Sequence, residues 1–218
     1  MRVIQFRGSS RELSVGKIVC VGQNYLKHIE EMKATRPEKP VLFLKPGTAL
    51  LGPDEPIRLP GFSSEIHHEV ELAVVVGRQM RRAAADHAFE CVAGYAVGLD
   101  LTARDWQREA KKQGGPWAVA KGFDGAAPVS EVASAEDVGD PGDLAIELRV
   151  NGAVRQSART SEMIFKVPEL LAYASGIFTL EPGDLVFTGT PSGVGLIQSG
   201  DVLDARIERI GAARWRVE

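Results

Sequence analysis

The chain has few of the features that mark secreted, membrane or nucleic-acid-binding proteins. Its 218 residues contain two cysteines, Cys20 and Cys91, in separate apolar contexts that are typical of buried free thiols and disfavour a zinc–thiolate site. No apolar run approaches the roughly 18–20 residues of a membrane-spanning helix, and the first residues lack the apolar core of a signal peptide. The net charge is −3 and the basic residues are scattered. We therefore expect a cytoplasmic protein with no membrane or nucleic-acid partner.

The remaining composition, 44% hydrophobic and 25% charged, is that of an ordinary globular protein. No internal repeat, low-complexity tract or linker interrupts it, so we expect a single domain over residues 1–218. Strand patterns recur at residues 17–22, 41–46, 70–76, 92–101, 144–150, 185–188 and 202–217. Helical patterns occupy residues 23–32, 82–92, 103–112 (with Thr102 as the cap) and 161–178, where Pro168 is well placed as the first residue of a new helix. The sequence Asn151-Gly152 predicts a tight hairpin. The fold class is therefore α+β and β-rich.

The segment 67–76 places two carboxylates beside a run of β-branched residues. The run from Val70 to Val76 reads as a strand, and its two apolar faces predict burial on both sides. Because side chains alternate along a strand, Glu69 and Glu71 share one face, with their Cβ atoms roughly 6–7 Å apart. Their repulsion is about 2–3 kcal/mol at an effective dielectric near 20, before any desolvation cost. The pair therefore requires a Lys, an Arg, a shared proton or a metal ion.

Two interpretations of that requirement stay open from the spacing alone. Asp100, at the end of another apolar strand, is the natural third carboxylate of a metal site. Three carboxylates suit hard ions, so Mg²⁺ is expected, with Mn²⁺ or Ca²⁺ as alternatives. The other interpretation is a buried salt-bridge network with Arg104 or Lys121. His67 and His68 lack the second histidine of a His-Glu-x-x-His zinc motif, and we expect them outside the site.

Two further segments carry candidate chemistry. His28 and Glu31 lie at i and i+3 of a short helical pattern, where the carboxylate would orient the imidazole as a general base. A surface ion pair is the alternative. The glycine-rich loop 189–195 lacks the Gly-Lys-Ser/Thr ending of a P-loop. It is either a simple turn or a loop whose backbone N–H groups hold a substrate carboxylate.

Six motifs appear in order along the chain. They are Val-Gly-x-Asn-Tyr-x-x-His-x-x-Glu-Met (21–32), Phe-x-Lys-Pro (43–46), His-Glu-Val-Glu-Leu (68–72), Asp-Leu-Thr-x-Arg-Asp-x-Gln (100–107), Trp-x-x-Ala-Lys-x-Phe-Asp (117–124) and Gly-Asp-x-Val-x-Thr-Gly-Thr-Pro-x-Gly-Val-Gly (183–195). As a set they resemble the fumarylacetoacetate hydrolase family over nearly the whole chain, most closely its short acylpyruvate hydrolase branch, which includes fumarylpyruvate hydrolases. The resemblance implies a mixed β-sandwich roll with flanking helices, commonly a homodimer.

The resemblance also implies roles for individual residues. The expected metal ligands are Glu69, Glu71 and Asp100. The expected catalytic residues are a polar group around the developing oxyanion and a water-activating dyad, namely Arg104, Gln107, Lys121, His28 and Glu31. The expected substrate contacts are Thr190, Gly189, Gln23 and Asn24. The segment 23–40 is expected to close as a lid. Gln23 stands where many relatives of this branch carry Arg, so the far end of the substrate is the least determined part of the site.

From this resemblance we expect a metal-dependent hydrolase that cleaves the carbon–carbon bond of a 3-acylpyruvate (a 2,4-dioxo acid such as fumarylpyruvate or acetylpyruvate). A metal-stabilised enolate serves other reactions equally well. The alternatives are therefore an oxaloacetate decarboxylase or tautomerase, or an isomerase of the 2-hydroxyhepta-2,4-diene-1,7-dioate type. A binding module for metal or ligand, without catalysis, is the alternative of a different class. The partner in each case is a small 2-oxo acid.

Overall fold

The strand that carries the carboxylate pair lies in the middle of a six-stranded sheet in the computed structural model, which describes residues 2–218. In spatial order the strands are β11 (Ala133–Ser134), β8 (Val92–Leu99), β7 (Val70–Val76), β14 (Leu185–Phe187), β3 (Lys17–Gly22) and β4 (Val41–Pro46). Only β14 and β3 run parallel within this sheet. Every residue of β7 is buried, which confirms the expectation of a strand covered on both faces.

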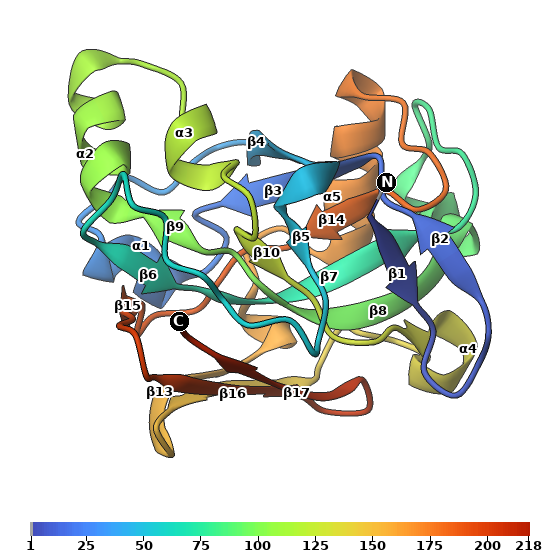
Figure 1. Ribbon diagram of the computed structural model, residues 1–218. Helices are drawn as coiled ribbons and strands as arrows, with labels where there is room; N and C mark the ends of the chain where they lie inside the picture. Colours follow the sequence, from blue (N-terminus) through green and yellow to red (C-terminus); the bar gives the residue numbers. More distant parts are fainter. Residues whose placement is uncertain (1) are drawn as a thin grey trace.

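A second, four-stranded antiparallel sheet packs against β7 and β8 (Figure 1). Its order is β13 (Ala153–Arg159), β12 (Ala145–Val150), β16 (Val202–Ile207) and β17 (Gly211–Arg216). The turn between β12 and β13 is formed by Asn151 and Gly152, whose φ angles of 51° and 79° are those of a two-residue hairpin turn. The predicted hairpin is therefore present. The alternating residues Leu148 and Val150 face the interface between the sheets and are buried.

Smaller elements complete the fold. The short strands are β1 (Val3–Gln5) with β2 (Glu12–Ser14), β5 (Leu50–Leu51) with β10 (Ala127–Pro128), and β6 (Ile66–His68) between β9 (Thr102–Ala103) and β15 (Gly195–Leu196). The α-helices are α1 (Leu26–Glu31), α2 (Arg104–Gln113), α3 (Ala118–Lys121), α4 (Ala135–Val138) and α5 (Val167–Ile177). Three 3₁₀ turns are η1 (Gly47–Ala49), η2 (Ala85–Cys91) and η3 (Thr160–Glu162). Helices α1 and α2 lie near β6 and β9, at the end of the sheet where β7 begins (Figure 1).

Two helix predictions require correction. The predicted helix 82–92 is only the 3₁₀ segment η2, because Arg82 has a left-handed backbone (φ 51°) and Ala84 is extended. The predicted helical segment 161–178 is divided into η3 and α5, and α5 begins beside Pro168, where a new helix was predicted. Between them, Ile164 and Phe165 donate their backbone N–H groups to the main-chain and side-chain oxygens of Asn24 (both 2.8 Å). These tertiary hydrogen bonds hold the segment out of the helix.

The cap predicted for the helix at residues 103–112 is also different. Thr102 belongs to β9, and its hydroxyl donates to the carbonyl of Asp100 (3.0 Å), so it does not cap α2. Asp105 accepts instead from the hydroxyl of Ser63 (2.6 Å) and the backbone N–H of Ser64 (3.2 Å). The start of α2 is thereby tied to the segment before β6. None of the helices among residues 2–218 is both long enough and apolar enough to cross a membrane.

Candidate active site

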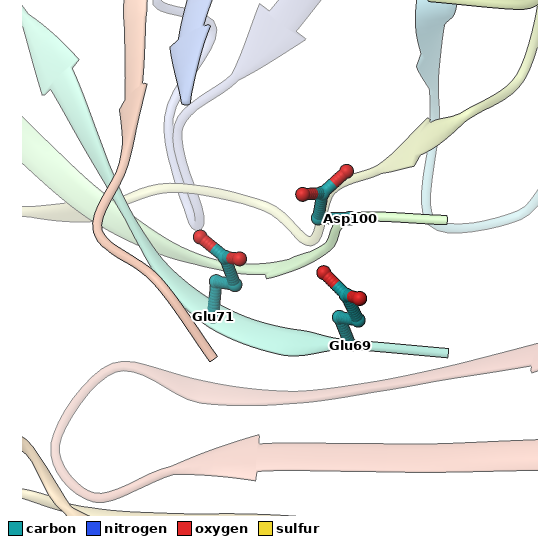
Figure 2. Close-up of side chains that lie close together, drawn as sticks. All are labelled: Glu69, Glu71 and Asp100. Atoms are coloured by element: carbon teal, nitrogen blue, oxygen red, sulfur yellow. The ribbon is translucent and has the colours of Figure 1, made fainter. Parts of the chain in front are cut away.

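The three carboxylates predicted as metal ligands meet at the amino end of β7. Glu69 directly precedes β7, Glu71 is its second residue, and Asp100 directly follows β8, the antiparallel neighbour of β7. Figure 2 shows the Glu69 and Glu71 side chains on the same side of the strand, with Asp100 next to them on the neighbouring segment. One oxygen from each residue lies within 4.8 Å of the others, and all three residues are buried. The alternation of the strand and the antiparallel register thus produce the cluster.

Cations neutralise two of the three carboxylates. Arg104, the first residue of α2, donates from Nη2 to Oε1 of Glu69, and Lys121, the last residue of α3, donates to Oε2 (2.9 Å). Lys121 also donates to Oδ2 of Asp100 (2.6 Å). Burial alone would raise the pKa of Glu69, but the charges of Lys121 and Arg104 outweigh it and hold that pKa well below its usual range. The predicted salt-bridge network therefore exists.

A third buried cation, Lys45, was not predicted as a site residue. Its side chain is 0% exposed, and its Nζ lies 2.8 Å from Oδ1 of Asp100. The same ammonium donates to the backbone carbonyls of Leu101 (3.2 Å), Ala126 (3.0 Å) and Lys121. These three carbonyls take the hydrogens of Lys45, so Oδ1 of Asp100 has a positive neighbour but no hydrogen bond. Lys45 lies in the motif Phe-x-Lys-Pro, which was the available signal.

Glu71 differs from the other two carboxylates because no cation of the described residues pairs with it. Its Oε2 accepts one hydrogen bond, from the backbone N–H of Gly189 (2.7 Å), and the residue is 1% exposed. Burial raises the pKa of Glu71 well above its ordinary value, and the charges of Asp100 and Glu69 raise it further. Burial of an unpaired carboxylate costs folding free energy unless a bound proton or a cation neutralises its charge.

These observations fit a divalent cation. Such ions bind oxygen ligands at about 2.0–2.6 Å, so oxygens on opposite sides of one ion are roughly 4–5 Å apart, which agrees with the 4.8 Å limit of this cluster. The buried Oδ1 of Asp100 lacks a hydrogen bond, and Glu71 lacks a cationic partner. An all-oxygen donor set is also the chemistry that hard ions prefer. The salt-bridge interpretation of the sequence is therefore confirmed, and the same three carboxylates also form a donor set that fits a divalent metal ion.

The carboxylates form the inner wall of a cavity at the amino end of β7. The predicted residues Arg104, Gln107 and Lys121 line it, and Arg104 donates from Nη1 to the amide oxygen of Gln107 (2.6 Å). Gln23 and Thr190 line it as well. Lys121 has three ammonium hydrogens and uses two for carboxylates, which leaves one for a ligand.

His28 lines the same cavity from α1, and its Nδ1 lies 3.2 Å from Oε2 of Glu31. With Glu31 ionised, Nδ1 carries the hydrogen and Nε2 remains as a base. Glu31 does not line the cavity and instead accepts from the backbone N–H of Gly193 (3.0 and 3.2 Å). The predicted dyad is therefore assembled, and its carboxylate is fixed by the loop 189–195.

That loop does not present its polar groups as predicted. Gly189 does not line the cavity: its N–H is used by Glu71, and its φ of 96° and the contact of 2.6 Å that a Cβ would make with Asn24 Cβ require glycine. The hydroxyl of Thr190 donates to the carbonyl of Val70 (2.9 Å) and accepts from Gln156 (2.8 Å). The loop thus supports the carboxylate strand.

Asn24 likewise does not line the cavity. Its side chain is fully buried and donates to the carbonyls of Phe165 (3.0 Å) and Thr188 (2.7 Å), so it has no group left for a substrate. The expectation of a substrate contact at Asn24 is therefore replaced by a structural role. His67 and His68 lie outside the cavity lining, as expected. His68 is buried and its Nδ1 contacts the amide oxygen of Gln156 (3.1 Å).

Besides Lys45, which lies behind Asp100 and does not line the cavity, six lining residues were not predicted, namely Val21, Gly22, Met32, Phe43, Lys111 and Trp117. The rings of Phe43 and Trp117 are 5.6 Å apart, and Lys121 Nζ lies 4.9 Å from the centre of the Phe43 ring. Both aromatic residues belong to recognised motifs in which they had no assigned role. Lys111 belongs to no motif, but its position four residues after Gln107 on α2 places it on the same helical face. That spacing was the available signal.

Fold and site together define a metal-dependent enzyme with a buried carboxylate centre. A model of the fumarylacetoacetate (FAA) hydrolase C-terminal family matches residues 17–218, so the chain belongs to this family, and the predicted resemblance and strand-rich fold class are confirmed. The chain is 49% identical over 199 residues to the oxaloacetate tautomerase YcgM of Escherichia coli, covering 91% of each protein. It is 45% identical over 213 residues to the mitochondrial oxaloacetate tautomerase FAHD1 of Homo sapiens, covering 97% of this chain and 96% of that protein.

A solved structure of the same fold carries ligands. It is fumarylpyruvate hydrolase from Pseudomonas aeruginosa in complex with Mn²⁺ and pyruvate, which superposes with a TM-score of 0.96 at 37% identity and covers 99% of this chain and 95% of that chain.

Proposed function

We propose that the protein is a metal-dependent oxaloacetate tautomerase, which interconverts the keto and enol forms of this 2-oxo dicarboxylic acid. The observation that carries the proposal is the inner end of the cavity, where three buried carboxylates lie beside Arg104 and Lys121. This arrangement suits a chelating 2-oxo acid whose negative charge grows at the C2 oxygen. Tautomerisation ranks above the expected acylpyruvate hydrolysis, because the two named tautomerases are 45–49% identical and the named hydrolase is 37% identical.

The residues that would hold the cation are Glu69, Glu71 and Asp100. When bound there, Mg²⁺ or Mn²⁺ would supply Lewis-acid polarisation of the 2-oxo group and charge neutralisation for the adjacent carboxylate. Mn²⁺ and pyruvate in the structure of the Pseudomonas relative support both the ion and the ligand class.

The chain itself supplies the proton transfer. His28, whose Nδ1 is held by Glu31, would take the C3 proton on Nε2, and the electron pair of that C–H bond becomes the C2–C3 double bond. The third N–H of Lys121 would donate a hydrogen bond to the C2 oxygen as its charge develops. Solvent would then protonate that oxygen and take the C3 proton from His28, which gives the enol, and the reverse sequence returns the ketone. Gln107 is held by Arg104 and faces the same space.

Hydrolysis of 3-acylpyruvates is the second candidate, and the dyad of His28 and Glu31 favours it specifically. The same base would deprotonate a water that attacks the C4 carbonyl, and cleavage of the C3–C4 bond would expel the enolate of pyruvate. The inner end of the cavity serves both reactions equally. The two reactions differ only in the substituent on C3 of the substrate and in whether a water molecule lies beside the C4 carbonyl.

The test measures both reactions on the purified protein. Ketonisation of enol-oxaloacetate is followed by the loss of its ultraviolet absorbance, and pyruvate release is followed with acetylpyruvate and fumarylpyruvate, each with Mg²⁺, Mn²⁺ or EDTA. We expect kcat/KM for oxaloacetate to exceed that for both acylpyruvates and EDTA to abolish all turnover. A higher kcat/KM for an acylpyruvate would assign hydrolysis. If no substrate is turned over with either metal, the protein would be assigned as a binding module for metal or ligand, without catalysis.

A further inference from the structure

Lys111 is a cation of the cavity that the reaction described above does not use. It lies on α2 at i+7 from Arg104 and i+4 from Gln107, and all three line the cavity. At 1.5 Å per residue, Lys111 is about 10 Å further along the helix axis than Arg104, which contacts Glu69. The face of α2 therefore extends from the carboxylate centre to the outer end of the cavity.

The ammonium of Lys111 is held in place without a carboxylate partner. Its Nζ lies 5.1 Å from the centre of the Trp117 ring, a cation–π distance, and within residues 2–218 it forms no salt bridge. Lys112, the next residue, is also exposed but does not line the cavity. Desolvation at the cavity wall and the charges of Arg104 and Lys121 lower the pKa of Lys111, as expected for a cation that faces other cations across a shared space.

The charges of the lining suit an anion with two negative groups. Among the lining residues, the carboxylates of Glu69, Glu71 and Asp100 balance the cations Arg104, Lys111 and Lys121, and Lys45 behind Asp100 adds one more positive charge. A divalent ion at the carboxylates would then leave at least two positive charges at the site. One end of a 2-oxo dicarboxylate would lie at the inner centre, and the second carboxylate would need a donor further out. Gln23, which also lines the cavity, is neutral.

We propose that Lys111 binds the second carboxylate of the substrate and selects 2-oxo dicarboxylic acids over 2-oxo monocarboxylic acids of the same length. This inference rests on the proposed function for the class of substrate and assigns the residue that recognises its far end. Trp117 positions the ammonium, and the carboxylate replaces the solvent that contacts Lys111 in the free protein. A charge-assisted hydrogen bond of this kind contributes about tenfold to a hundredfold in affinity.

The test compares oxaloacetate with 2-oxobutyrate, which has the same chain length and a methyl group in place of the second carboxylate. Dissociation constants are measured by calorimetry with Mn²⁺ present for the wild-type protein and for Lys111→Met, Lys111→Arg and Lys112→Met. Binding is measurable whether or not the ligand is turned over, so this result is independent of the tautomerase assay. The wild-type protein and Lys112→Met should bind oxaloacetate at least about tenfold more tightly than 2-oxobutyrate.

Lys111→Met should lose the preference for oxaloacetate because it binds oxaloacetate more weakly, while its affinity for 2-oxobutyrate stays within about twofold of the wild-type value. Lys111→Arg should keep most of the preference. A preference that survives in Lys111→Met, or is absent from the wild-type protein, would overturn the assignment of Lys111. Loss of affinity for both ligands would show a structural role and would also overturn it. Tautomerase activity without this preference would leave the proposed function standing.

Discussion

The two ends of the cavity are built by different means. The inner end lies between two central strands, and its three carboxylates are buried. Arg104, Lys121 and Lys45 neutralise two of them, and Glu71 has no cationic partner. The outer end consists of the short helix α1 and the second half of α2, and its groups have few partners: His28 contacts Glu31, and Lys111 lies over Trp117. The inner end is thus fixed by packing and charge, whereas the outer end is positioned by single contacts.

This difference separates the chemistry that related enzymes share from the chemistry that distinguishes them. Stabilising an enolate requires the inner end in every reaction considered for this chain. Moving a proton at C3, activating a water or recognising a second carboxylate requires the outer end. Changes at the inner end should therefore affect all reactions together, and changes at the outer end should affect one reaction or one substrate class.

The largest effect is expected from Glu71→Gln. Glutamine preserves the shape of the side chain and the hydrogen bond from Gly189 but removes a metal ligand, so all turnover of oxaloacetate and acylpyruvates should fall about a thousandfold, as loss of several kcal/mol of Lewis-acid stabilisation implies. Steady-state assays and calorimetric titration with Mn²⁺ measure this. Wild-type metal affinity or activity in the variant would show that Glu71 is not a ligand.

His28→Ala should separate the reactions. Tautomerisation and acylpyruvate hydrolysis need a base, so both should fall by about 10²–10⁴. Decarboxylation of oxaloacetate breaks the C3–C4 bond without removing a C3 proton, and its rate should stay within about threefold. Equal loss of decarboxylation in the same preparation, measured as CO₂ release, would contradict the role of His28 as a base and place it in substrate or metal binding.

Metal and pH should act together on stability through Glu71. Its folded-state pKa is raised by burial and by Asp100 and Glu69, so the metal-free native state keeps a proton that the unfolded chain releases above about pH 4.5. Metal-free stability should therefore fall as pH rises above that value. Saturation with Mg²⁺ at about 100 times Kd should add about 2.7 kcal/mol, and several degrees in Tm. When the Mg²⁺ concentration is held constant, the gain should increase with pH, because binding displaces the proton of Glu71, and it should be absent in Glu71→Gln. A gain independent of pH at constant Mg²⁺ would argue against proton release at Glu71.

The smallest effect is expected from Glu31→Gln, which keeps a hydrogen-bond acceptor for His28 but removes its charge. Tautomerisation should fall about tenfold, because a neutral partner gives a weaker hydrogen bond and orients the imidazole less firmly. The matched control is Glu30→Gln, an exposed neighbour on α1 that does not line the cavity. Equal kcat/KM values for the two variants would remove Glu31 from the mechanism.

Much of the site was predictable because it depends on local patterns. The alternation along β7 put Glu69 and Glu71 on one face, and the end of the next strand supplied Asp100. Helix boundaries were less accurate, since Asn24 holds residues 164–165 by hydrogen bonds that no local pattern encodes. The same tertiary contacts use up the side chain of Asn24 and the N–H of Gly189, which were expected to contact substrate.

The sequence by itself determined that a buried carboxylate pair would need positive charge, because strand periodicity and apolar flanks follow from neighbouring residues. Only the tertiary structure decided which charge serves which oxygen. Lys121 meets Glu69 across 52 residues of sequence, and Lys45 reaches Asp100 from an edge strand of the same sheet. Such pairings depend on strand order and on the path of the backbone between elements, which side-chain periodicity does not specify. Glu71 remains without a cation for the same reason, and that leaves it for a metal ion.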